Sequence, residues 1–439
     1  MEIKVAKFGG SSLADSAQFI KVGAIVRSDP ARRYIVASAP GRSQNFDQKI
    51  TDQLYTIVQL RDANGNYIPL LKRIFERFQS IKEDLGLTLD LDKEYHQILE
   101  AIQEGIGEDY IASRGEYLNA KLLAEFLEYD FVDAHDCILF NARGAFDAEK
   151  TNSYLRQVLK KHEKAVLPGF YGAKPDDSIV TFSRGGSDIT GSIVARATSA
   201  ALYENWTDVS GVLMADPGCI KNPRTIEIIT YKELRELAYM GAAVLHDEAV
   251  FPVRYVGIPI NIRNTNKPDD NGTMIVPQAS GIIPDTVITG IAGKLGFTSI
   301  TVEKDRMNAE LGFGRRVLGA LEDAGLCFEH LPSGIDTMSV IVNSHAFKPL
   351  RAKIVSSIFR STDPDGLTIE EHLALIAIVG RGMKAQKGTA TRIFSALQKA
   401  NINVKLIDQG SSEINIIVGV EEKDFHDAIE AIYYEFVTQ

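Results

Sequence analysis

The run Lys7–Ser12, with the sequence KFGGSS, places a lysine and two glycines directly after an alternating apolar stretch at residues 3–6. Glycines let the backbone approach a ligand closely, and the N–H groups at the start of a following helix favour an anion. Lys7 adds a positive point charge to that environment. An ordinary strand-to-helix turn with a surface lysine has the same pattern, so this run alone leaves both interpretations open.

A second glycine-rich turn, Ser183–Asp188 (SRGGSD), follows another apolar run at residues 178–181. It precedes a stretch of small residues, which predicts a helix over 189–202. Two such turns, one with Lys and one with Arg and Asp, suit a site that holds phosphate and a charged small molecule. No GxxxxGK[ST] phosphate-binding loop occurs in the sequence, so the predicted phosphoryl-transfer enzyme is of a different kind.

Bulk properties predict a cytoplasmic enzyme. The chain has 439 residues, which exceeds what one hydrophobic core usually supports. Its net charge of -10 argues against nucleic-acid and anionic-membrane partners. The three cysteines are far apart and have no metal-ligand spacing, which indicates a reducing compartment. A strand within the first residues leaves no room for a signal peptide, and no apolar run is long enough to span a bilayer.

Residues 1 to about 265 alternate short β-rich runs with longer helical patterns. Strands are expected at 3–6, 34–37, 131–133, 165–168, 179–182 and 258–263, and helices at 69–85, 93–105, 115–127, 151–161 and 231–245. This alternation predicts an α/β fold with a mostly parallel sheet covered on both faces. Ligands of such sheets bind at the carboxyl ends of the strands, where we expect both glycine turns to lie.

The remaining sequence contains an internal repeat. A shift of 76 positions aligns Gly312 with Gly388, Arg316 with Arg392 and Ile341 with Ile417 without a gap. Each copy has the pattern strand, glycine, helix, strand, turn, strand, which is typical of a small α+β module. We therefore expect a catalytic domain at 1–283, a linker near 280–286 and a regulatory domain at 284–439. The two copies cover about 300–360 and 373–439, either side by side or interleaved.

Further motifs occur in the order typical of one family. They are TDQL at 51–54, RGE at 114–116, TDVSG at 207–211, ADP at 215–217, GAAVLH at 241–246, GRGM at 380–383 and QGSSE at 409–413. With them the chain resembles the aspartate kinases of the amino-acid kinase superfamily over nearly its whole length. The resemblance implies a three-layer α/β/α kinase domain followed by two ACT-like modules. We expect a monofunctional kinase, because a homoserine dehydrogenase extension would need several hundred more residues.

The resemblance implies ATP-dependent phosphorylation of the β-carboxylate of L-aspartate, the first step of lysine, threonine and methionine biosynthesis. That carboxylate is ionised at pH 7 and needs no general base, but an anion must then attack an anion. Catalysis therefore depends on positioning and on cations. Lys7 is the expected catalytic cation, and Gly9, Gly10 and Ser11 are expected to donate N–H groups to ATP. Asp188 would organise Lys7 and Mg²⁺–ATP; its alternative role is a helix N-cap.

The resemblance also implies how aspartate is recognised. Arg184 offers a planar fork for a carboxylate, and Glu116 is expected to pair with the α-ammonium group. The alternative for Glu116 is a solvated acid favoured at a helix start. The other expected substrate-binding residues are Ser38, Ala39, Thr51, Gly185, Gly186 and Ser187.

The nucleotide side is less fully specified. Thr207, Asp208 and Asp216 are expected at the ATP site, although Asp216 before a proline is equally typical of a turn. The sequence departs from the family pattern at Gly218, Ala243 and Asp247, where Arg, Lys and Pro are common in the family. Contacts to the phosphates on this side therefore stay open.

The repeat region is expected to bind an amino-acid effector, lysine alone or with threonine. Backbone N–H groups near Met307 and Gly312 would hold the effector carboxylate at a helix start. Glu329, on a strand expected at 327–330, would select lysine by charge; an exposed strand acid is its alternative. The resemblance implies a homo-oligomer, a dimer or tetramer, assembled through these modules. The alternative functions are another amino-acid kinase of the same fold, of glutamate or acetylglutamate type, and a catalytically silent amino-acid sensor.

Overall fold

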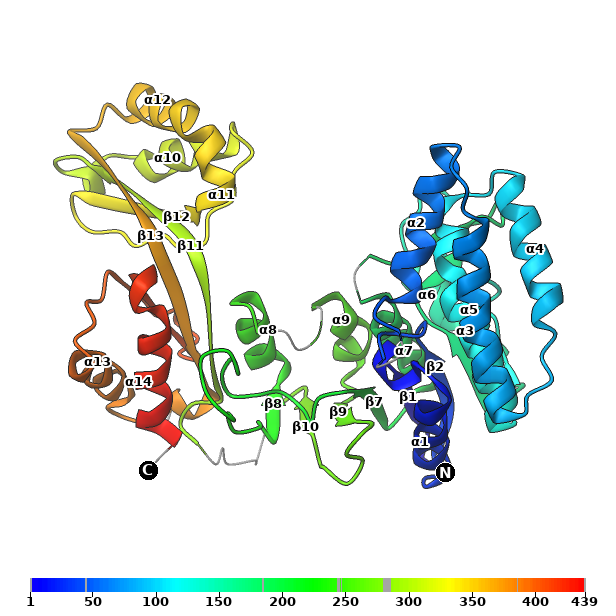
Figure 1. Cartoon of the computed structure of the whole chain (residues 1–439). Coiled ribbons are helices and arrows are strands. Elements are labelled where there is room, and N and C mark those ends of the chain that lie inside the picture. Colours follow the sequence, from blue (N-terminus) through cyan, green and yellow to red (C-terminus); the bar gives the residue numbers. More distant parts are fainter. Residues whose placement is uncertain are drawn as a thin grey trace. The chain divides into compact units, whose positions relative to one another are not determined.

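The computed structural model describes residues 2–43, 46–183, 185–242, 245, 247–278, 286–384 and 386–437, with only the backbone at 247–249. It divides into two compact units (Figure 1). The first unit comprises residues 1–212, 225–231 and 244–279, and the second comprises 213–224, 232–243 and 280–439. No helix within the described ranges is long and apolar enough to cross a membrane.

The first unit is built on an eight-stranded sheet in the order β3-β4-β2-β1-β7-β9-β10-β8. The strands are β1 (Lys4–Phe8), β2 (Arg32–Ala37), β3 (Asp130–Phe131), β4 (Ala165–Pro168), β7 (Leu202–Thr207), β8 (Ile228–Thr230), β9 (Ile260–Asn264) and β10 (Thr273–Val276). Neighbouring strands are parallel, except that β9 and β10 are antiparallel. The predicted mostly parallel sheet is confirmed.

Helices cover both faces of this sheet, which gives three layers. They are α1 (Ser16–Arg27), α2 (Ile50–Asp62), α3 (Ile68–Leu85), α4 (Leu91–Gln103), α5 (Glu108–Leu127), α6 (Ala148–Leu159), α7 (Gly186–Thr198) and α9 (Asp247–Val256). Helices α1 to α5 share a core with Ala6, Phe8 and Trp206 on one sheet face. Helix α7 packs against β1, β2 and β7 and also contacts α6 and α9. The α/β/α architecture follows from this distribution.

The predicted helix over 189–202 is wrong at its carboxyl end. Helix α7 ends at Thr198, Ser199 adopts a left-handed φ of 51°, and Leu202 begins β7. This strand lies between β1 and β9 in the middle of the sheet. The sequence patterns therefore missed a central strand.

The second glycine turn is preceded by a separate small sheet. It follows β6 (Ile179–Thr181), which pairs with β5 (Tyr171–Ala173) in a separate two-stranded antiparallel sheet. The turn therefore does not continue a strand of the large sheet, although Asp188 and Ser187 lie beside Lys7 and Gly169 at the carboxyl ends of β1 and β4, as expected. It reaches the first glycine turn through α7, which starts at Gly186 and packs on β1.

The second unit is built on an antiparallel five-stranded sheet in the order β12-β11-β13-β15-β14. The strands are β11 (Gly290–Glu303), β12 (Thr337–Asn343), β13 (Gly366–Val379), β14 (Leu406–Asp408) and β15 (Asn415–Glu421). The helices are α8 (Tyr231–Tyr239), α10 (Phe313–Glu322), α11 (Ser344–Phe347), α12 (Arg351–Thr362), α13 (Thr389–Lys399) and α14 (Phe425–Val437). Helix α8 is shorter than the predicted 231–245.

The repeat is visible in the backbone. Gly312 and Gly388 are the N-cap residues of α10 and α13, with left-handed φ values of 76° and 86°. Strands β11 and β13 are each 14 residues long and pair from Gly290–Val379 at one end to Glu303–Gly366 at the other. Both copies therefore use these two strands. The proposed linker at 280–286 lies almost entirely outside the described residues.

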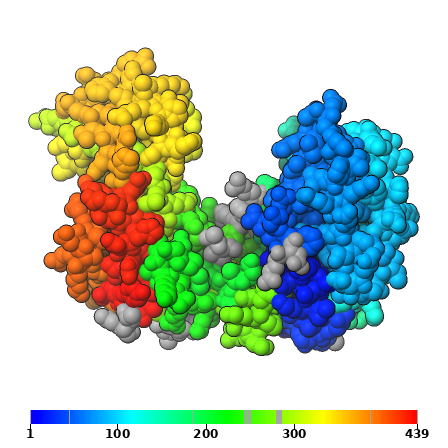
Figure 2. Space-filling model, viewed as in Figure 1, coloured from blue at the N-terminus to red at the C-terminus, as the bar shows by residue number. Residues whose placement is uncertain are grey.

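Two segments that precede the repeat in sequence belong to the second unit. The N–H of Ile291 in β11 donates to the carbonyl of Met214 over 2.7 Å, and the Tyr433 hydroxyl of α14 accepts from the N–H of Arg224 over 2.9 Å. Figure 2 shows the red C-terminal residues beside green residues of this region. The segment 213–224 therefore packs directly on the elements of the second unit.

Candidate active site

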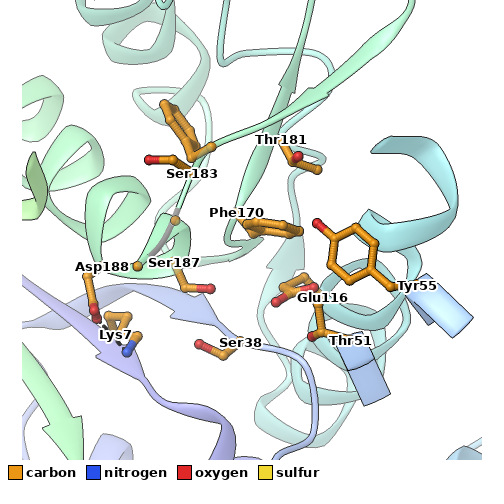
Figure 3. A pocket seen from close by; sticks show the side chains of 13 residues that line it. Lys7, Ser38, Thr51, Tyr55, Glu116, Phe170, Thr181, Ser183, Ser187 and Asp188 are labelled. Carbon is orange, nitrogen blue, oxygen red and sulfur yellow. Dashed lines mark ion pairs between the residues drawn. The ribbon is translucent and has the colours of Figure 1, made fainter. Parts of the chain in front are cut away.

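A cavity of about 700 Å³ in the first unit brings together residues from both glycine turns (Figure 3). Eight of its lining residues are predicted site residues: Lys7, Ser38, Thr51, Glu116, Gly185, Gly186, Ser187 and Asp188. They come from β1, the residue after β2, the helices α2 and α5, and the start of α7. Residues more than 180 positions apart in the sequence therefore share one pocket.

Lys7 and Asp188 form the charged end of this pocket. The Lys7 Nζ lies 2.5 Å from Oδ1 of Asp188, and Lys7 is only 7% exposed. Asp188 lies in the first turn of α7, where the helix dipole favours a negative charge. Figure 3 shows this ion pair on one side of the cavity, with Glu116, Thr51 and Tyr55 on the other. A cation and an anion thus lie at the junction of the two turns.

The first glycine turn continues β1 into a short 3-10 helix at Gly10–Leu13, followed by α1. The Gly9 N–H donates to the Trp206 carbonyl over 2.9 Å, so it does not point to a ligand as predicted. Gly10 and Ser11 stay candidates for that role. A Cβ atom at Gly10 would lie 2.8 Å from the carbonyl oxygen of Ala39. Only glycine fits here, because this turn packs tightly on the segment after β2.

Glu116 is a buried acid of the pocket with a raised pKa. It lies in the middle of α5 and is 5% exposed, and burial raises the pKa of its carboxyl to about 8. The Ala39 N–H donates a hydrogen bond to this carboxylate. This hydrogen bond and the positive charges of Lys7 and Arg114 lower the pKa, but by less than burial raises it. Its Oε2 is buried without a hydrogen-bond partner among the described residues. The alternative reading as a solvated helix-start acid is wrong.

Two residues with left-handed backbone conformations shape the second turn. Gly185 has a φ of 74°, and Phe170 has a φ of 80°, which is unusual for a residue with a side chain. A Cβ at Gly186 would lie 2.6 Å from the Phe170 ring, so the turn needs glycine against this aromatic wall. Arg184 lies outside the described residues, and its predicted role stays a prediction.

The pocket also contains residues that sequence reasoning missed: Tyr55, Phe170, Thr181, Phe182 and Ser183. Tyr55 follows Thr51 by four positions, which is one helical turn on α2, so its place beside Thr51 had a signal in the spacing. Thr181 donates a hydrogen bond to Asp109 over 2.6 Å. Nothing in the sequence pattern distinguished the two phenylalanines from ordinary core residues.

The structure places the other predicted nucleotide residues outside this cavity's lining. Thr207 ends β7, and its hydroxyl lies 3.2 Å from a carboxylate oxygen of the exposed Asp208. Asp216 belongs to the second unit and accepts the Gly218 N–H over 2.7 Å, as a turn-forming residue does. Ala243 lies outside the described residues, and Asp247 begins α9.

The predicted effector residues lie in the first copy of the repeat. Met307 is 7% exposed and belongs to the hydrophobic core of that copy, so its side chain is structural. Residues 327–330 do not form the expected strand; His330 makes a single bridge with Ile341. Glu329 accepts a hydrogen bond from the hydroxyl of Tyr239 on α8. Burial and, after it, this hydrogen bond raise the pKa of Tyr239 to about 12.

Residues 2–264 match the model of the amino acid kinase family, and residues 376–436 match an ACT domain. The layered fold, the pocket between two glycine turns and the ACT portion therefore define a regulated amino acid kinase.

The relatives specify the family further. The chain is 39% identical to Aspartokinase 3 of Bacillus subtilis, over 99% of this chain and 98% of that protein. It is 47% identical to the aspartate kinase of Clostridium acetobutylicum, whose crystal structure matches with a TM-score of 0.89 over 99% of this chain and 100% of that one. Aspartokinase III of E. coli in complex with aspartate and ADP has the same fold, with a TM-score of 0.76 at 23% identity and full coverage of both chains. The chain belongs to the aspartokinase family, and its enzymatic activity is that of an ATP-using aspartate kinase.

Proposed function

We propose that the pocket between the two glycine turns is where the γ-phosphoryl group of ATP is transferred to the β-carboxylate of L-aspartate, giving 4-phospho-L-aspartate. The single observation that supports this placement is the joint presence of Lys7, Asp188 and Glu116 in one cavity of about 700 Å³. Aspartate has two carboxylates and an ammonium group, and the phosphoryl group of ATP is also negative. A site for both therefore needs positive and negative side chains close together.

Lys7 supplies the cation that the chemistry requires. Both the attacking carboxylate and the transferring phosphoryl group are anionic, so the barrier falls when a fixed positive charge faces the developing negative charge. Lys7 is nearly buried and is held by Asp188 at 2.5 Å. It therefore needs little reorganisation when the phosphate arrives. No group of the pocket has to act as a general base, because the aspartate carboxylate is already ionised.

Aspartate is held by groups of opposite charge on the other side of the pocket. The carboxylate of Glu116 has a buried oxygen without a hydrogen-bond partner among the described residues, which an α-ammonium group would satisfy. Arg184 grips the α-carboxylate with two parallel hydrogen bonds. Ser38, Thr51 and Ser187 line the same cavity and offer hydroxyl groups to the substrate.

The nucleotide binds as its Mg²⁺ complex, and the ion is part of the substrate. The N–H groups of Gly10 and Ser11 face its phosphates at the start of the 3-10 helix, and Asp188 orients Lys7 toward them. Thr207 and Asp208, at the carboxyl end of β7, lie beside the adenosine. For Asp216 a nucleotide contact stays a prediction, and its hydrogen bond from the Gly218 N–H is that of a turn-forming residue.

The ACT portion gives feedback control by L-lysine, alone or with threonine. Aspartokinase III of E. coli, which shares the fold, has been crystallised with lysine and aspartate. In this chain Glu329 is the proposed charge-selective group, and the N–H groups at Gly312 bind the effector carboxylate. The enzyme is cytoplasmic and forms a dimer or tetramer through its ACT modules.

Two alanine variants test the catalytic assignment. Lys7→Ala and Asp188→Ala should each lower kcat by roughly 10²–10³, the usual loss when a preorganised electrostatic group is removed. Lys4→Ala is the matched control, because Lys4 lies on the same strand but forms a half-buried pair with Asp29 outside the pocket lining. Near-normal turnover in either variant, measured by coupled ADP release with aspartate, would remove that residue from its role.

A further inference from the structure

Asn205 lies in the middle of β7 on the sheet face that α7 covers. In the parallel pairing of β1 with β7 its partner position is Lys7, and the partner of Tyr203 is Val5. Side chains at alternate positions of a strand share a face, so Lys7, Tyr203 and Asn205 all project toward α7. Tyr203 confirms this direction, because its hydroxyl donates to the Asp188 carbonyl over 3.1 Å.

The amide of Asn205 contacts the acid of the proposed catalytic pair. Its Nδ2 donates to Oδ1 of Asp188 over 2.9 Å, and Asn205 is 4% exposed. Since an ionised carboxylate only accepts hydrogen bonds, the amide group that faces it must be the NH₂ donor. The same Oδ1 atom is the one that lies 2.5 Å from the Lys7 Nζ. One oxygen thus serves two donors from adjacent strands.

A polar amide in a buried central strand is costly unless its hydrogen bonds are made. The neighbouring Glu204 is buried on the opposite face, where Arg32 pairs with it at 2.6 Å and Trp206 donates to it at 3.0 Å. Asn205 donates instead to the carboxylate of Asp188. The hydrogen bond of Asn205 is therefore made to a residue of the candidate active site and not to a residue of the hydrophobic core.

We propose that Asn205 is a positioning residue that sets the orientation of Asp188 and, through it, of Lys7. The amide fixes the Asp188 carboxylate from the β7 side while Lys7 approaches from β1, so the carboxylate cannot turn away. Both donors meet at the same carboxylate oxygen, so the position of the amide also sets where Lys7 lies. The inference rests on the proposed roles of Lys7 and Asp188.

A double-mutant cycle on the full-length chain tests this role. Asn205→Ala should lower kcat by roughly tenfold, with KM for ATP and aspartate within about threefold of the wild type, because it touches only the group that orients the cation. In the Asp188→Ala background the same change should have no further effect, because its target is gone. Asn205→Asp should lower kcat at least as much, since it replaces the donor by a second acceptor of the same size.

Asn261→Ala is the matched control, because Asn261 is a buried asparagine of β9 (6% exposed) outside the pocket lining. Its kcat should stay within about twofold of the wild type. A wild-type kcat in Asn205→Ala or Asn205→Asp would overturn the inference, and so would a full tenfold loss in the Asp188→Ala background. If Asp188→Ala itself turned over normally, the proposed catalytic pair would fail instead. Thermal unfolding of each variant separates these outcomes from misfolding.

Discussion

The raised pKa of Glu116 leads to a quantitative prediction for aspartate recognition. Burial raises this pKa to about 8, and only the ionised form can pair with the α-ammonium group of aspartate. At pH 7 about one enzyme molecule in eleven then has the ionised carboxylate, from the ratio 1/(1 + 10^(8−7)). We expect kcat/KM for aspartate to be about elevenfold lower at pH 7 than on its plateau, equivalent to ~1.4 kcal/mol.

The assay is kcat/KM for aspartate at saturating Mg²⁺–ATP, measured in steps from pH 6 to pH 8.5. In a plot of log(kcat/KM) against pH, the acid limb is the part below pH 8. It should rise with a slope of one and begin to level off near pH 8. Glu116→Gln should remove this limb and lower kcat/KM throughout, because a neutral amide cannot pair with the ammonium group. Glu94→Gln is the matched control, because Glu94 is equally buried (6% exposed) but pairs with Lys121 outside the pocket lining. A flat wild-type profile, or a limb that persists in Glu116→Gln, would refute the assignment.

The same shift has a consequence for stability. The pKa of Glu116 is higher in the folded chain than the ~4.3 of an unfolded glutamate, so the native state binds more protons between about pH 4 and pH 8. The contribution of Glu116 to the free energy of unfolding is therefore highest below this pH window and decreases as the pH rises through it. Glu116→Gln should melt several degrees above the wild type at pH 8 and at the same temperature near pH 4. Calorimetry at both pH values measures the difference, and equal melting temperatures at pH 8 would contradict the burial argument.

Two further predictions concern ligands. Arg184→Ala should raise KM for aspartate more than tenfold and leave KM for ATP within about threefold, and Arg184→Lys should restore little, because an ammonium group lacks the planar fork; loss of ATP binding instead would assign the second turn to the nucleotide. L-lysine, alone or with threonine, should inhibit turnover through a coupling of ~1–3 kcal/mol. Glu329→Gln should weaken lysine inhibition several-fold and Tyr239→Phe should strengthen it, since the Tyr239 hydroxyl occupies the same carboxylate; activity unchanged by both amino acids would leave the ACT portion an assembly module.

Much of the fold could be predicted from the sequence, because its signals are local. The helices near 69–85, 93–105 and 151–161 are confirmed as α3, α4 and α6, where apolar residues recur with helical spacing. The repeat is confirmed by Gly312 and Gly388, whose left-handed φ values require the same residue at the same place.

Strand β7 could not be predicted in this way. Its sequence, LYENWT, has two polar residues at its centre, and a buried parallel strand is usually a continuous apolar run. Glu204 is compensated by Arg32, which is 172 positions away, and Asn205 by Asp188 on the helix before it. The partners that make these residues acceptable in a core are set by the fold, so no local pattern shows them.

The same distinction between local signals and contacts set by the fold applies to the candidate active site. The residues of the two glycine turns were predicted because turn chemistry leaves a signature in a few adjacent positions. That Lys7 and Asp188 touch is a property of β1, β7 and α7 together, since the second turn follows a small separate ribbon rather than the large sheet. Glu116 shows the limit most clearly: the motif marks the residue, but only its burial in α5 raises its pKa to about 8. The pH at which this enzyme takes up aspartate should therefore depend on the packing around α5 more than on the motif itself, and substitutions that admit water near Ala39 should move the acid limb toward lower pH.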